Sequence, residues 1–464
     1  MYKVYRKIIL ACLLLIVAST VCGQRVTQTI NDGWKFSLFE GDASTADFDI
    51  SGWTDVSIPH TWNAKDADDE IPGYFRGKGW YRKVVTVEEL IPEQRVYLSF
   101  EGANQETNVF VNGTFVGNHK GGYSAFTFDV TDYVHAGRNL IAVSVDNSHH
   151  PDIAPLSADF TFFGGIYRDV YLVYTSPVQL STTHYASSGV YLKASKITDL
   201  QANISVKTFL SNALKSNQSL ILETEILDAD GNRVALSQKK VNVKAEEKNV
   251  AFESLMTITQ PKRWDVDSPY IYKVYSRLKN KKEEVLDCVV NPLGIREYRF
   301  DAEKGFFLNG KYRKLIGTSR HQDYKGMGNA LRDEMHIRDV QLSKDMGSNF
   351  LRVAHYPQDP VVMQMCDKLG LLTSVEIPVV NAITQSKAFM DNCVEQVTEM
   401  VYQNYNYPSV IIWAYMNEVL LRPPFNPENR TERADYMTFL HQIASAVEAQ
   451  IRSLDSERYT MLPC

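Results

Sequence analysis

The sequence predicts a multidomain protein in which two β-sandwich domains precede a parallel α/β domain. Residues 24 to about 296 carry short apolar or alternating runs separated by turn signals, a pattern typical of sandwiches. From about residue 297 onward, short apolar strands alternate with amphipathic helical segments, which indicates repeated βα units. With 464 residues, of which 44% are apolar, the chain can form roughly two to four domains, each with its own core.

The first 23 residues predict a signal peptide rather than part of the fold. Three basic residues stand among the first seven positions, an apolar run follows over 8–18, and small residues then suit cleavage before Gln24. The run is too short for a membrane span, so we expect an exported protein, periplasmic or extracellular. Cys22 offers a lipid anchor as an alternative, which the bulky Val21 before it disfavours.

Charge and cysteine usage exclude several classes of partner. The formal net charge of −6 argues against nucleic acid or an anionic membrane surface, which favour a basic face. Beyond the signal peptide, Cys288, Cys366, Cys393 and Cys464 are scattered without a C-x-x-C pair. We therefore expect buried thiols, with neither a zinc site nor a disulfide framework. The oligomeric state stays open, and a homo-oligomer is compatible with the sequence.

The two β-rich domains follow from their strand patterns. Strands are expected at 96–100, 108–111 and 140–145 in the first domain, and at 204–209, 220–226 and 272–276 in the second. Turn signals such as Asn112-Gly113 separate them. The second domain contains little that suggests chemistry, and we interpret it as an immunoglobulin-like spacer.

The third domain is predicted from alternating strands and helices. The expected strands are 314–317, 350–354, 371–375, 410–414 and 459–462, and the expected helices are 332–346, 359–369, 387–404 and 432–453. Such units form either a barrel or a doubly wound sheet. An eight-stranded barrel needs about 250 residues. Because only about 165 follow residue 300, a barrel would be present up to its fifth strand.

Polar side chains stand at the C-terminal ends of four successive strands. In a parallel barrel this edge carries the functional residues. The side chains are Arg320-His321, Arg352 with His355 and Tyr356, Glu376, and Asn417-Glu418. Each has an ordinary structural explanation when taken alone, and Glu376 is explained equally well as a scaffold carboxylate. Together they indicate a site. Glu418 is the strongest candidate for a general acid, because we expect it to be buried, and burial favours a protonated carboxyl.

Several motifs carry a resemblance to a known family. They are Asn31–Trp34, Ile58–Trp62, Gly79–Lys83, Asp159–Asp169, Asn291–Arg296, Gly317–Gln322, Arg352–Pro357 and Trp413–Glu418. With them the sequence resembles glycoside hydrolase family 2, and within it the β-galactosidase branch, over nearly the whole mature chain. The resemblance implies a jelly-roll sugar-binding domain at 24–178, an immunoglobulin-like β-sandwich at 179–296 and the N-terminal part of a (β/α)8 TIM barrel at 297–464.

The resemblance also implies an activity and residue roles. The family hydrolyses β-glycosides with retention, by two carboxylates about 5 Å apart, and the branch implies terminal non-reducing β-D-galactosides of an oligosaccharide or glycan as substrates. Glu418 would be the acid/base, and Asn417 would bind the sugar 2-hydroxyl. His321 and His355 would contact the sugar, and Arg352 would keep the nucleophilic carboxylate ionised. Further substrate-binding candidates are Asp159, Tyr356 and Glu376.

Two departures from the family pattern limit these expectations. The nucleophile would follow the seventh barrel strand, beyond the 46 residues that follow Glu418. Glu432, Glu448 and Glu457 lie in or beside the last helix and are poor substitutes, so we expect a truncated chain that is inactive alone. The stretch 377–382 has neither carboxylate nor histidine, although some relatives bind magnesium there. We therefore expect no metal or other cofactor.

Three alternatives stay open. A β-glucuronidase of the same family differs in sugar contacts that the 464 residues would not contain. A non-catalytic carbohydrate-binding protein would use the first sandwich alone. In a split enzyme, a separate chain would supply the remaining strands.

Overall fold

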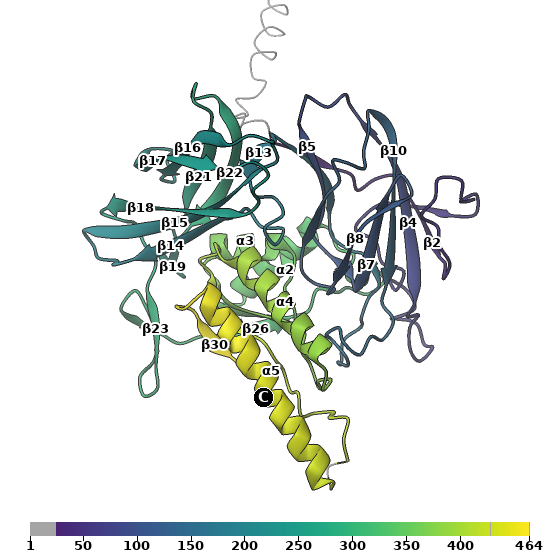
Figure 1. Ribbon diagram of the computed structural model, residues 1–464. Helices are drawn as coiled ribbons and strands as arrows, with labels where there is room; N and C mark the ends of the chain where they lie inside the picture. Colours follow the sequence, from purple (N-terminus) through teal and green to yellow (C-terminus); the bar gives the residue numbers. More distant parts are fainter. Residues whose placement is uncertain (1–24, 427, 464) are drawn as a thin grey trace, which may run out of the picture.

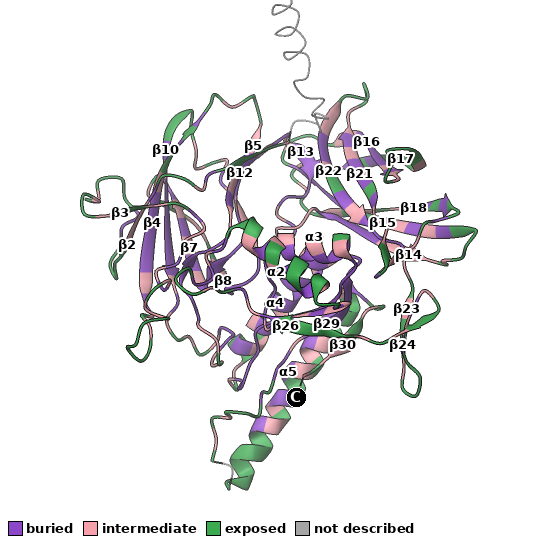
Figure 2. Cartoon of the chain, turned by 180° about the vertical axis from the view of Figure 1, so that it is seen from behind, coloured by how far each residue is buried: buried purple, intermediate pink, exposed green. Residues whose placement is uncertain are grey.

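The computed structural model describes residues 25–426 and 428–463, which form two β-sandwiches and a parallel sheet with helices (Figure 1). The two sandwiches stand at either side, and the α/β part lies below and between them in both views (Figure 2). The expected signal peptide, with Cys22, and Cys464 lie outside the described residues. No helix in the described part is both long and apolar enough to cross a membrane.

The first sandwich packs a four-stranded sheet against a six-stranded one. The smaller sheet has the order β1 (Val26–Thr29), β12 (Val170–Thr175), β5 (Arg95–Phe100) and β9 (Phe126–Asp129). The larger has the order β3 (Thr54–Val56), β2 (Trp34–Leu38), β4 (Lys78–Val87), β10 (Gly137–Asp146), β7 (Glu106–Val111) and β8 (Thr114–Lys120), and β6 (Ala103–Asn104) pairs with β11 (Gly165–Ile166). Alternate residues such as Leu98 and Val143 are fully buried between the sheets, as the period of a strand requires.

The second sandwich has two four-stranded sheets. One contains β13 (Val178–Leu180), β15 (Gln201–Asn212), β14 (Val190–Ser195) and β18 (Val250–Thr259), and the other β17 (Arg233–Val243), β16 (Gln218–Leu227), β21 (Tyr272–Lys279) and β22 (Val285–Leu293). A small pair, β19 (Trp264–Asp265) and β20 (Ser268–Pro269), follows β18. Cys288 on β22 is disulfide-bonded, which corrects the expectation of thiols without disulfides. Cys366 and Cys393 are free and buried, as expected.

The α/β part begins with an antiparallel sheet of β23 (Tyr298–Asp301), β24 (Gly305–Leu308) and β25 (Lys311–Arg313). A parallel sheet then keeps chain order: β26 (Gly317–Arg320), β27 (Phe350–Val353), β28 (Leu372–Glu376), β29 (Val410–Ala414) and β30 (Tyr459–Met461). Its helices are α2 (Asp333–Asp345), α3 (Pro360–Leu369), α4 (Lys387–Asn404) and α5 (Arg430–Leu454). This sequential order is that of a barrel and not of a doubly wound sheet, whose order reverses at a switch point.

The first parallel strand is displaced from its expected position. The apolar run at 314–317 suggested the strand, yet β26 covers 317–320 and shares only Gly317 with it. A side chain at Gly317 would collide with the carbonyl oxygen of Phe350, 1.7 Å from an ideal Cβ, so glycine permits β26 and β27 to pair closely. The strand therefore consists mostly of exposed polar residues, which alternation of apolar residues cannot detect.

Helix boundaries agree with the local chemistry. Asp359 caps α3 by accepting a hydrogen bond from the Val361 amide at 2.9 Å, Pro360 occupies the first turn, and Gly370 ends the helix at φ 71°. Ser386 caps α4, and its hydroxyl accepts from the Phe389 amide at 3.0 Å. These caps explain why the expected helices at 359–369 and 387–404 are found within one residue.

Helix α4 joins the α/β part to both sandwiches. The Gln403 amide donates to the carbonyl oxygen of Ala125 in the first sandwich and to that of Tyr185 in the second, both at 2.9 Å. His119 on β8 contacts Glu399 on α4, with Nε2 2.8 Å from Oε1. These contacts fix the first sandwich against the C-terminal half of α4.

A buried ion pair at the base of the parallel sheet generates a stability prediction. Asp455 accepts from the Arg458 guanidinium at 2.6 Å and from the Trp413 indole at 3.0 Å. Burial would raise the pKa of Asp455, but the charge and hydrogen bonds of Arg458 outweigh burial and hold it well below its ordinary range. Asp455→Asn should lower the free energy of unfolding by about 3 kcal/mol at pH 7, measured by urea denaturation.

The pH dependence of that difference has a defined sign. The pKa of Asp455 is lower in the folded state than in the unfolded state, where it is about 3.9. The ionised carboxyl therefore stabilises the fold fully above about pH 3.9, and this stabilisation is lost progressively as the pH falls below that value. The stability gap between wild type and Asp455→Asn should therefore narrow from pH 5 to pH 2. Asp230→Asn, at an exposed turn, is the control. A gap that stays constant over this range contradicts the prediction.

Candidate active site

The residues predicted from the strand ends gather at one edge of the parallel sheet. Arg352 of β27 pairs with Ser374 of β28, so Glu376 at the end of β28 stands two residues further toward this edge. Asn417 follows β29, where its backbone amide donates to the carbonyl oxygen of Val379 at 2.8 Å. The parallel register thus brings side chains from three strands into contact.

A guanidinium–carboxylate pair lies at the centre of this edge. The Arg352 guanidinium donates to both oxygens of Glu376, from Nε at 3.1 Å and from Nη2 at 3.2 Å. Nη2 also donates to the Asn417 amide oxygen at 2.8 Å. Glu376 is only 1% exposed, so this two-pronged contact supplies the charge compensation that a buried carboxylate requires. Arg352 therefore orients Asn417, whose NH2 group stays available on the side of Glu418.

Two histidines stand beside this pair. His355 Nδ1 lies 3.2 Å from Glu376 Oε1, and His321 Nδ1 lies 3.2 Å from the Tyr356 hydroxyl. The two imidazole rings are 5.3 Å apart. Burial, and then the charge of His355, lower the pKa of His321, so it is neutral at pH 7 and able both to donate and to accept a hydrogen bond. Tyr356 is buried beneath the histidines.

The first sandwich contributes a wall of this site. The Phe160 ring centroid lies 5.2 Å from those of His321 and Tyr356 and 6.1 Å from that of His355. Asp159 beside it is exposed, and its charge acts to raise the pKa of His321 against the effect of burial. Sequence reasoning found Asp159 but missed Phe160, although the two are adjacent in one motif.

Tyr123 is a second contribution from the first sandwich that sequence reasoning missed. Its ring stacks on that of Tyr356, with centroids 4.1 Å apart and planes at 12°. The signal that could have found it is the preceding glycine pair: an added Cβ at Gly122 would lie 1.9 Å from the amide oxygen of Asn104. Such a close approach fixes the loop that presents Tyr123.

Glu418 differs from its expected state. Its side chain is exposed, so the expectation of a buried carboxyl is wrong for the described chain. The residue lies in a turn beyond β29, at φ 51°, where its carbonyl oxygen accepts from the Leu421 amide. Its Oε2 is 3.4 Å from the Asn417 amide nitrogen, which leaves the carboxyl beside the polar cluster and open to solvent. A carboxyl in this position can exchange a proton with a bound molecule.

The other three glutamates lie outside the cluster. Glu448 contacts Arg452 one helical turn along α5 at 2.8 Å, and Glu457 contacts Lys193 of the second sandwich at 2.9 Å. Glu432 accepts from the Asn426 amide near the start of α5. None of the three is found in contact with the strand-end cluster, which we define as His321, Arg352, His355, Glu376, Asn417 and Glu418.

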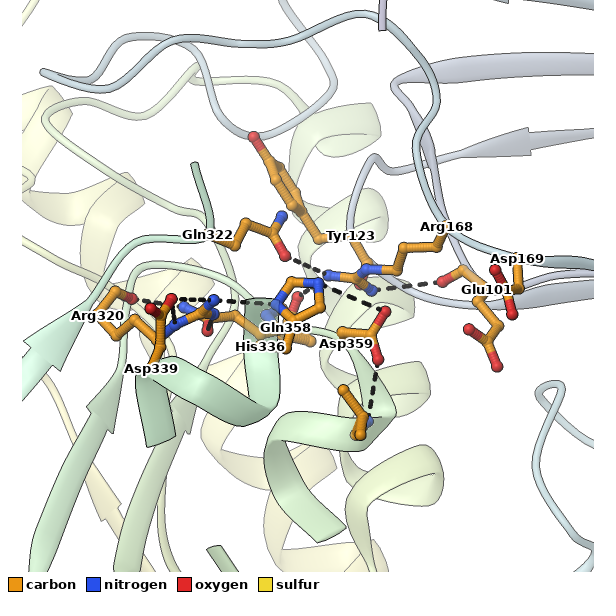
Figure 3. A network of polar contacts seen from close by, with 12 residues as sticks. Glu101, Tyr123, Arg168, Asp169, Arg320, Gln322, His336, Asp339, Gln358 and Asp359 are labelled. Carbon is orange, nitrogen blue, oxygen red and sulfur yellow. Dashed lines mark hydrogen bonds and ion pairs between the residues drawn. The ribbon is translucent and has the colours of Figure 1, made fainter. Parts of the chain in front are cut away.

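Arg168 connects the first sandwich to the loops that carry the site (Figure 3). Its guanidinium donates to the Gln322 side chain at 3.0 Å and to the Pro357 carbonyl oxygen at 2.8 Å. Gln322 follows His321, and Pro357 follows Tyr356. One buried guanidinium from the sandwich thus fixes the loops after β26 and β27 together.

Arg320 faces away from the cluster, toward α2. It donates to Asp339 from Nε at 2.9 Å and from Nη2 at 2.7 Å, and Nη2 lies 2.9 Å from His336 Nδ1. Burial, with the charge of Arg320, lowers the pKa of His336 to about 3, so the imidazole is neutral and accepts from the guanidinium. Arg320 is thus a structural residue that fastens β26 to α2 (Figure 3).

A group of carboxyls lies on the other side of Arg168. Burial, and then the charges of Asp359 and Asp169, raise the pKa of Glu101 to about 8, although Arg168 acts to lower it. The pKa of Asp333 at the start of α2 is also raised, by burial and then by Asp359 and Asp169. In Figure 3, Asp359 lies below the Arg168 guanidinium, and Glu101 and Asp169 lie to the right of Asp359. One cation therefore compensates several neighbouring carboxyls only in part.

Three models of one family match successive parts of the chain. The sugar binding domain of glycosyl hydrolases family 2 matches residues 27–177, the model described simply as glycosyl hydrolases family 2 matches 188–296, and the TIM barrel domain of that family matches 301–459. The matches confirm the predicted fold class of jelly-roll, immunoglobulin-like and TIM-barrel domains.

Curated relatives are named for two sugars. A putative β-glucuronidase of Formosa agariphila is 35% identical over 96% of this chain, and a β-glucuronidase of Bacteroides fragilis is 36% identical over 88%. A β-galactosidase of Thermoanaerobacter pseudethanolicus is 34% identical over 85%. The alignments cover 53%, 58% and 51% of those proteins, so the chain spans about half the length of the curated relatives it matches.

Solved structures show the same arrangement. β-Glucuronidase 2 of Bacteroides uniformis, covalently bound to cyclophellitol-6-carboxylate aziridine, has a TM-score of 0.91 and 39% identity, covering 95% of this chain and 52% of that one. A form of that enzyme with two aspartates replaced by alanine, described as a calcium binding mutant, has a TM-score of 0.88 and 38% identity, covering 95% and 53%.

The Arg352–Glu376 pair generates a stability prediction. Arg352→Leu leaves a buried carboxylate with His355 but without its guanidinium, and should lower the free energy of unfolding by about 3–5 kcal/mol, measured by urea denaturation. Replacing both residues, Arg352→Leu with Glu376→Leu, should recover most of that loss because the uncompensated charge is removed. Arg338→Leu, at an exposed position of α2, is the control. A double variant as unstable as Arg352→Leu contradicts this account.

Proposed function

Because the chain belongs to glycosyl hydrolase family 2, we propose that it forms the sugar-binding and acid/base part of a retaining β-glycosidase that acts on β-glucuronides. The observation that carries the proposal is the strand-end cluster, in which Arg352 and Glu376 position Asn417 next to the open carboxyl of Glu418. Carbohydrates bind through many hydroxyl groups, and this cluster offers amide, imidazole and carboxyl groups within one small area.

Each residue has a role that follows from its contacts. Glu418 protonates the leaving oxygen and then activates water, because its carboxyl is open to a bound molecule. Asn417 donates to a sugar hydroxyl through Nδ2, since its Oδ1 is held by Arg352. His321 and His355 bind other hydroxyls, and Phe160 covers an apolar face of the ring.

The second carboxylate of the retaining mechanism is not provided by Glu376. A nucleophile needs free access to the anomeric carbon, but Glu376 is 1% exposed, and both of its oxygens accept from Arg352. We assign this role to polypeptide outside the described strands, in keeping with relatives about twice as long as this chain. Glu376 is a positioning residue.

The choice of sugar rests on the relatives. Those with the highest identities quoted above are named β-glucuronidases, and the solved structure with a TM-score of 0.91 is one as well. This favours glucuronides over the galactosides expected from the motifs. β-Galactosides are the second candidate, because a relative at 34% identity is named a β-galactosidase.

The proposal predicts a specific loss on changing Glu418. In a chain extended with the coding sequence downstream, p-nitrophenyl β-glucuronide should be hydrolysed faster than the β-galactoside, measured as kcat/KM. Glu418→Gln should lower this activity by about 10²- to 10⁴-fold, the usual contribution of general acid–base catalysis. Glu432→Gln is the matched control and should leave activity unchanged.

Three results would overturn parts of this proposal. Full activity of Glu418→Gln excludes the acid/base role. Sugar binding that persists without turnover in the extended chain supports a carbohydrate-binding protein instead. Faster hydrolysis of the galactoside replaces the glucuronide by the second candidate.

The set of carboxyl side chains near Arg168, which includes Glu101, Asp333 and Asp359, supports a second proposal, calcium binding. Asp333 and Asp359 are separated by the same number of residues as the two aspartates replaced in the calcium binding mutant of the Bacteroides uniformis enzyme. Calcium prefers carboxylate and carbonyl oxygens, and here burial, followed by the charges of Asp359 and Asp169, raises the pKa of the Glu101 carboxyl. No three His, Cys, Asp or Glu of the described residues lie close enough to hold a metal as they stand, so binding would draw these side chains together.

Calcium should then stabilise the fold. At a calcium concentration one hundred times Kd, the free energy of unfolding should rise by about 2.7 kcal/mol. The Tm of the chain with CaCl2 and with EDTA measures this effect. Asp333→Asn should abolish the shift, whereas Asp345→Asn at the other end of α2 should retain it. An equal shift in both variants, or none in the wild type, contradicts the proposal.

A further inference from the structure

A cavity of about 310 Å³, which we call the basal cavity, lies between the second sandwich and the α/β part. Its walls are β14 with the bend after it, the segment that follows β22, and the residues just before β29 and β30. Figures 1 and 2 both show β14 on the side of the second sandwich that faces β30. Because the cavity borders the starts of parallel strands, it lies at the opposite edge of the sheet from the strand-end cluster. Small-molecule sites occur preferentially at such domain interfaces.

Two arginines in the wall of the basal cavity share one carbonyl oxygen. Arg296 donates to the carbonyl oxygen of Val410 from Nη2 at 2.6 Å, and Arg458 donates to the same oxygen from Nε at 2.9 Å. Asp455 compensates Arg458, because it accepts from Nη1 of that arginine at 2.6 Å. No carboxylate of the described residues forms an ion pair with Arg296. Two guanidiniums therefore meet at this wall, and only one of them has a paired carboxylate.

Arg296 presents a free donor to the basal cavity. Its side chain lines the cavity and is partly exposed. Nη2 is occupied by Val410 and Nε is enclosed by protein, whereas Nη1 is not enclosed and forms no hydrogen bond with the described residues. Burial, opposed by Tyr298 and aided by the charge of Arg458, lowers the pKa of Arg296 to about 10, so the guanidinium stays protonated at pH 7. A charged donor is thus available to a molecule in the cavity.

The remaining charges of the wall leave a second cation without a partner. Both other acidic residues are already compensated: Glu457 pairs with Lys193 at 2.9 Å. Glu297 pairs with Arg263, which lies outside the cavity, at 3.0 Å. Lys196, exposed in the bend after β14, forms no ion pair with the described residues. The wall therefore carries an excess of positive charge, which selects an anion as the occupant.

The placement of the donors favours a tetrahedral anion. Arg296 comes from the segment after β22, whereas Lys196 and the Ser195 hydroxyl come from β14 and the bend after it. The oxygens of a phosphate or sulfate group point in four directions and can accept hydrogen bonds from both of these walls. A carboxylate holds its two oxygens in one plane, on one side of the group. Charge-assisted hydrogen bonds from a guanidinium are short and strong, so one such donor is a substantial part of an anion site.

We propose that the basal cavity binds a phosphate or sulfate group through Arg296 and Lys196. The group is a free ion or is carried on a sugar, since the cavity has room for more than the ion alone. The site is separate from the strand-end cluster and does not depend on the activity proposed above. Because its walls come from the second sandwich and from the α/β part, the bound anion stabilises the contact between these two domains.

The test measures anion binding to the full chain by calorimetry at constant ionic strength set with NaCl. The probes are inorganic phosphate, sulfate, glucose 6-phosphate, acetate and glucose. Phosphate, sulfate or glucose 6-phosphate should bind at one site per chain, and glucose should not bind there. Lys196→Glu, which turns an attractive charge into a repulsive one at an exposed position, should weaken that binding about tenfold or more. Tighter binding of glucose 6-phosphate than of phosphate assigns the anion to a sugar, and the reverse assigns it to a free ion.

Lys215→Glu makes the same charge change between β15 and β16 of the same sandwich, outside the basal cavity, and should bind as the parent does. Arg296→Leu should abolish binding. If that variant fails to fold because Val410 loses its donor, Lys196→Glu still decides the question. The proposal is overturned by no binding of the three tetrahedral anions, by equal binding in Lys196→Glu and Lys215→Glu, or by acetate binding as tightly as phosphate. None of these outcomes depends on turnover of a glycoside.

Discussion

The contact between Arg352 and Glu376 is the interaction on which the strand-end site depends. A carboxylate that is 1% exposed is stable as an ion only with a compensating charge, and the two-pronged guanidinium supplies it. The same guanidinium then fixes the Asn417 amide, which belongs to a different strand. One cation therefore joins three strand ends, and the exposed Glu418 carboxyl lies beside Asn417, the residue that this cation orients.

The first sandwich packs directly against the strand-end residues. Phe160 and Tyr123 pack against His321, His355 and Tyr356, while Arg168 bonds to the loops that carry them. Helix α4 contacts both sandwiches through Gln403, so the three domains form one continuous body. This arrangement explains how the first sandwich, distant in the sequence, can contribute side chains at the ends of the parallel strands.

Much of the fold followed from the sequence because strong local signals agree with it. The helices of the α/β part were predicted to within about two residues, since caps such as Asp359 and Ser386 act locally. The strand β26 was displaced because Thr318 and Ser319 carry no apolar pattern, and its position is set by contact with Phe350. The exposure of Glu418, the packing of Phe160 and the disulfide at Cys288 depend on residues far apart in the chain. The residues at the strand ends could be predicted because parallel strands place them at one edge of the sheet. Their hydrogen-bond and packing partners could not be predicted from the spacing of residues in the sequence.

The most direct test of the acid/base role uses a substrate that does not need an acid. In an extended chain, Glu418→Gln should hydrolyse p-nitrophenyl β-glucuronide slowly but still release 2,4-dinitrophenol rapidly from its β-glucuronide, whose leaving group requires no proton. Azide, a nucleophile that requires no general base, should then restore turnover and yield the β-glucuronosyl azide, as retention demands. Equal losses on both substrates without azide rescue would contradict the assignment of Glu418 and with it the central claim.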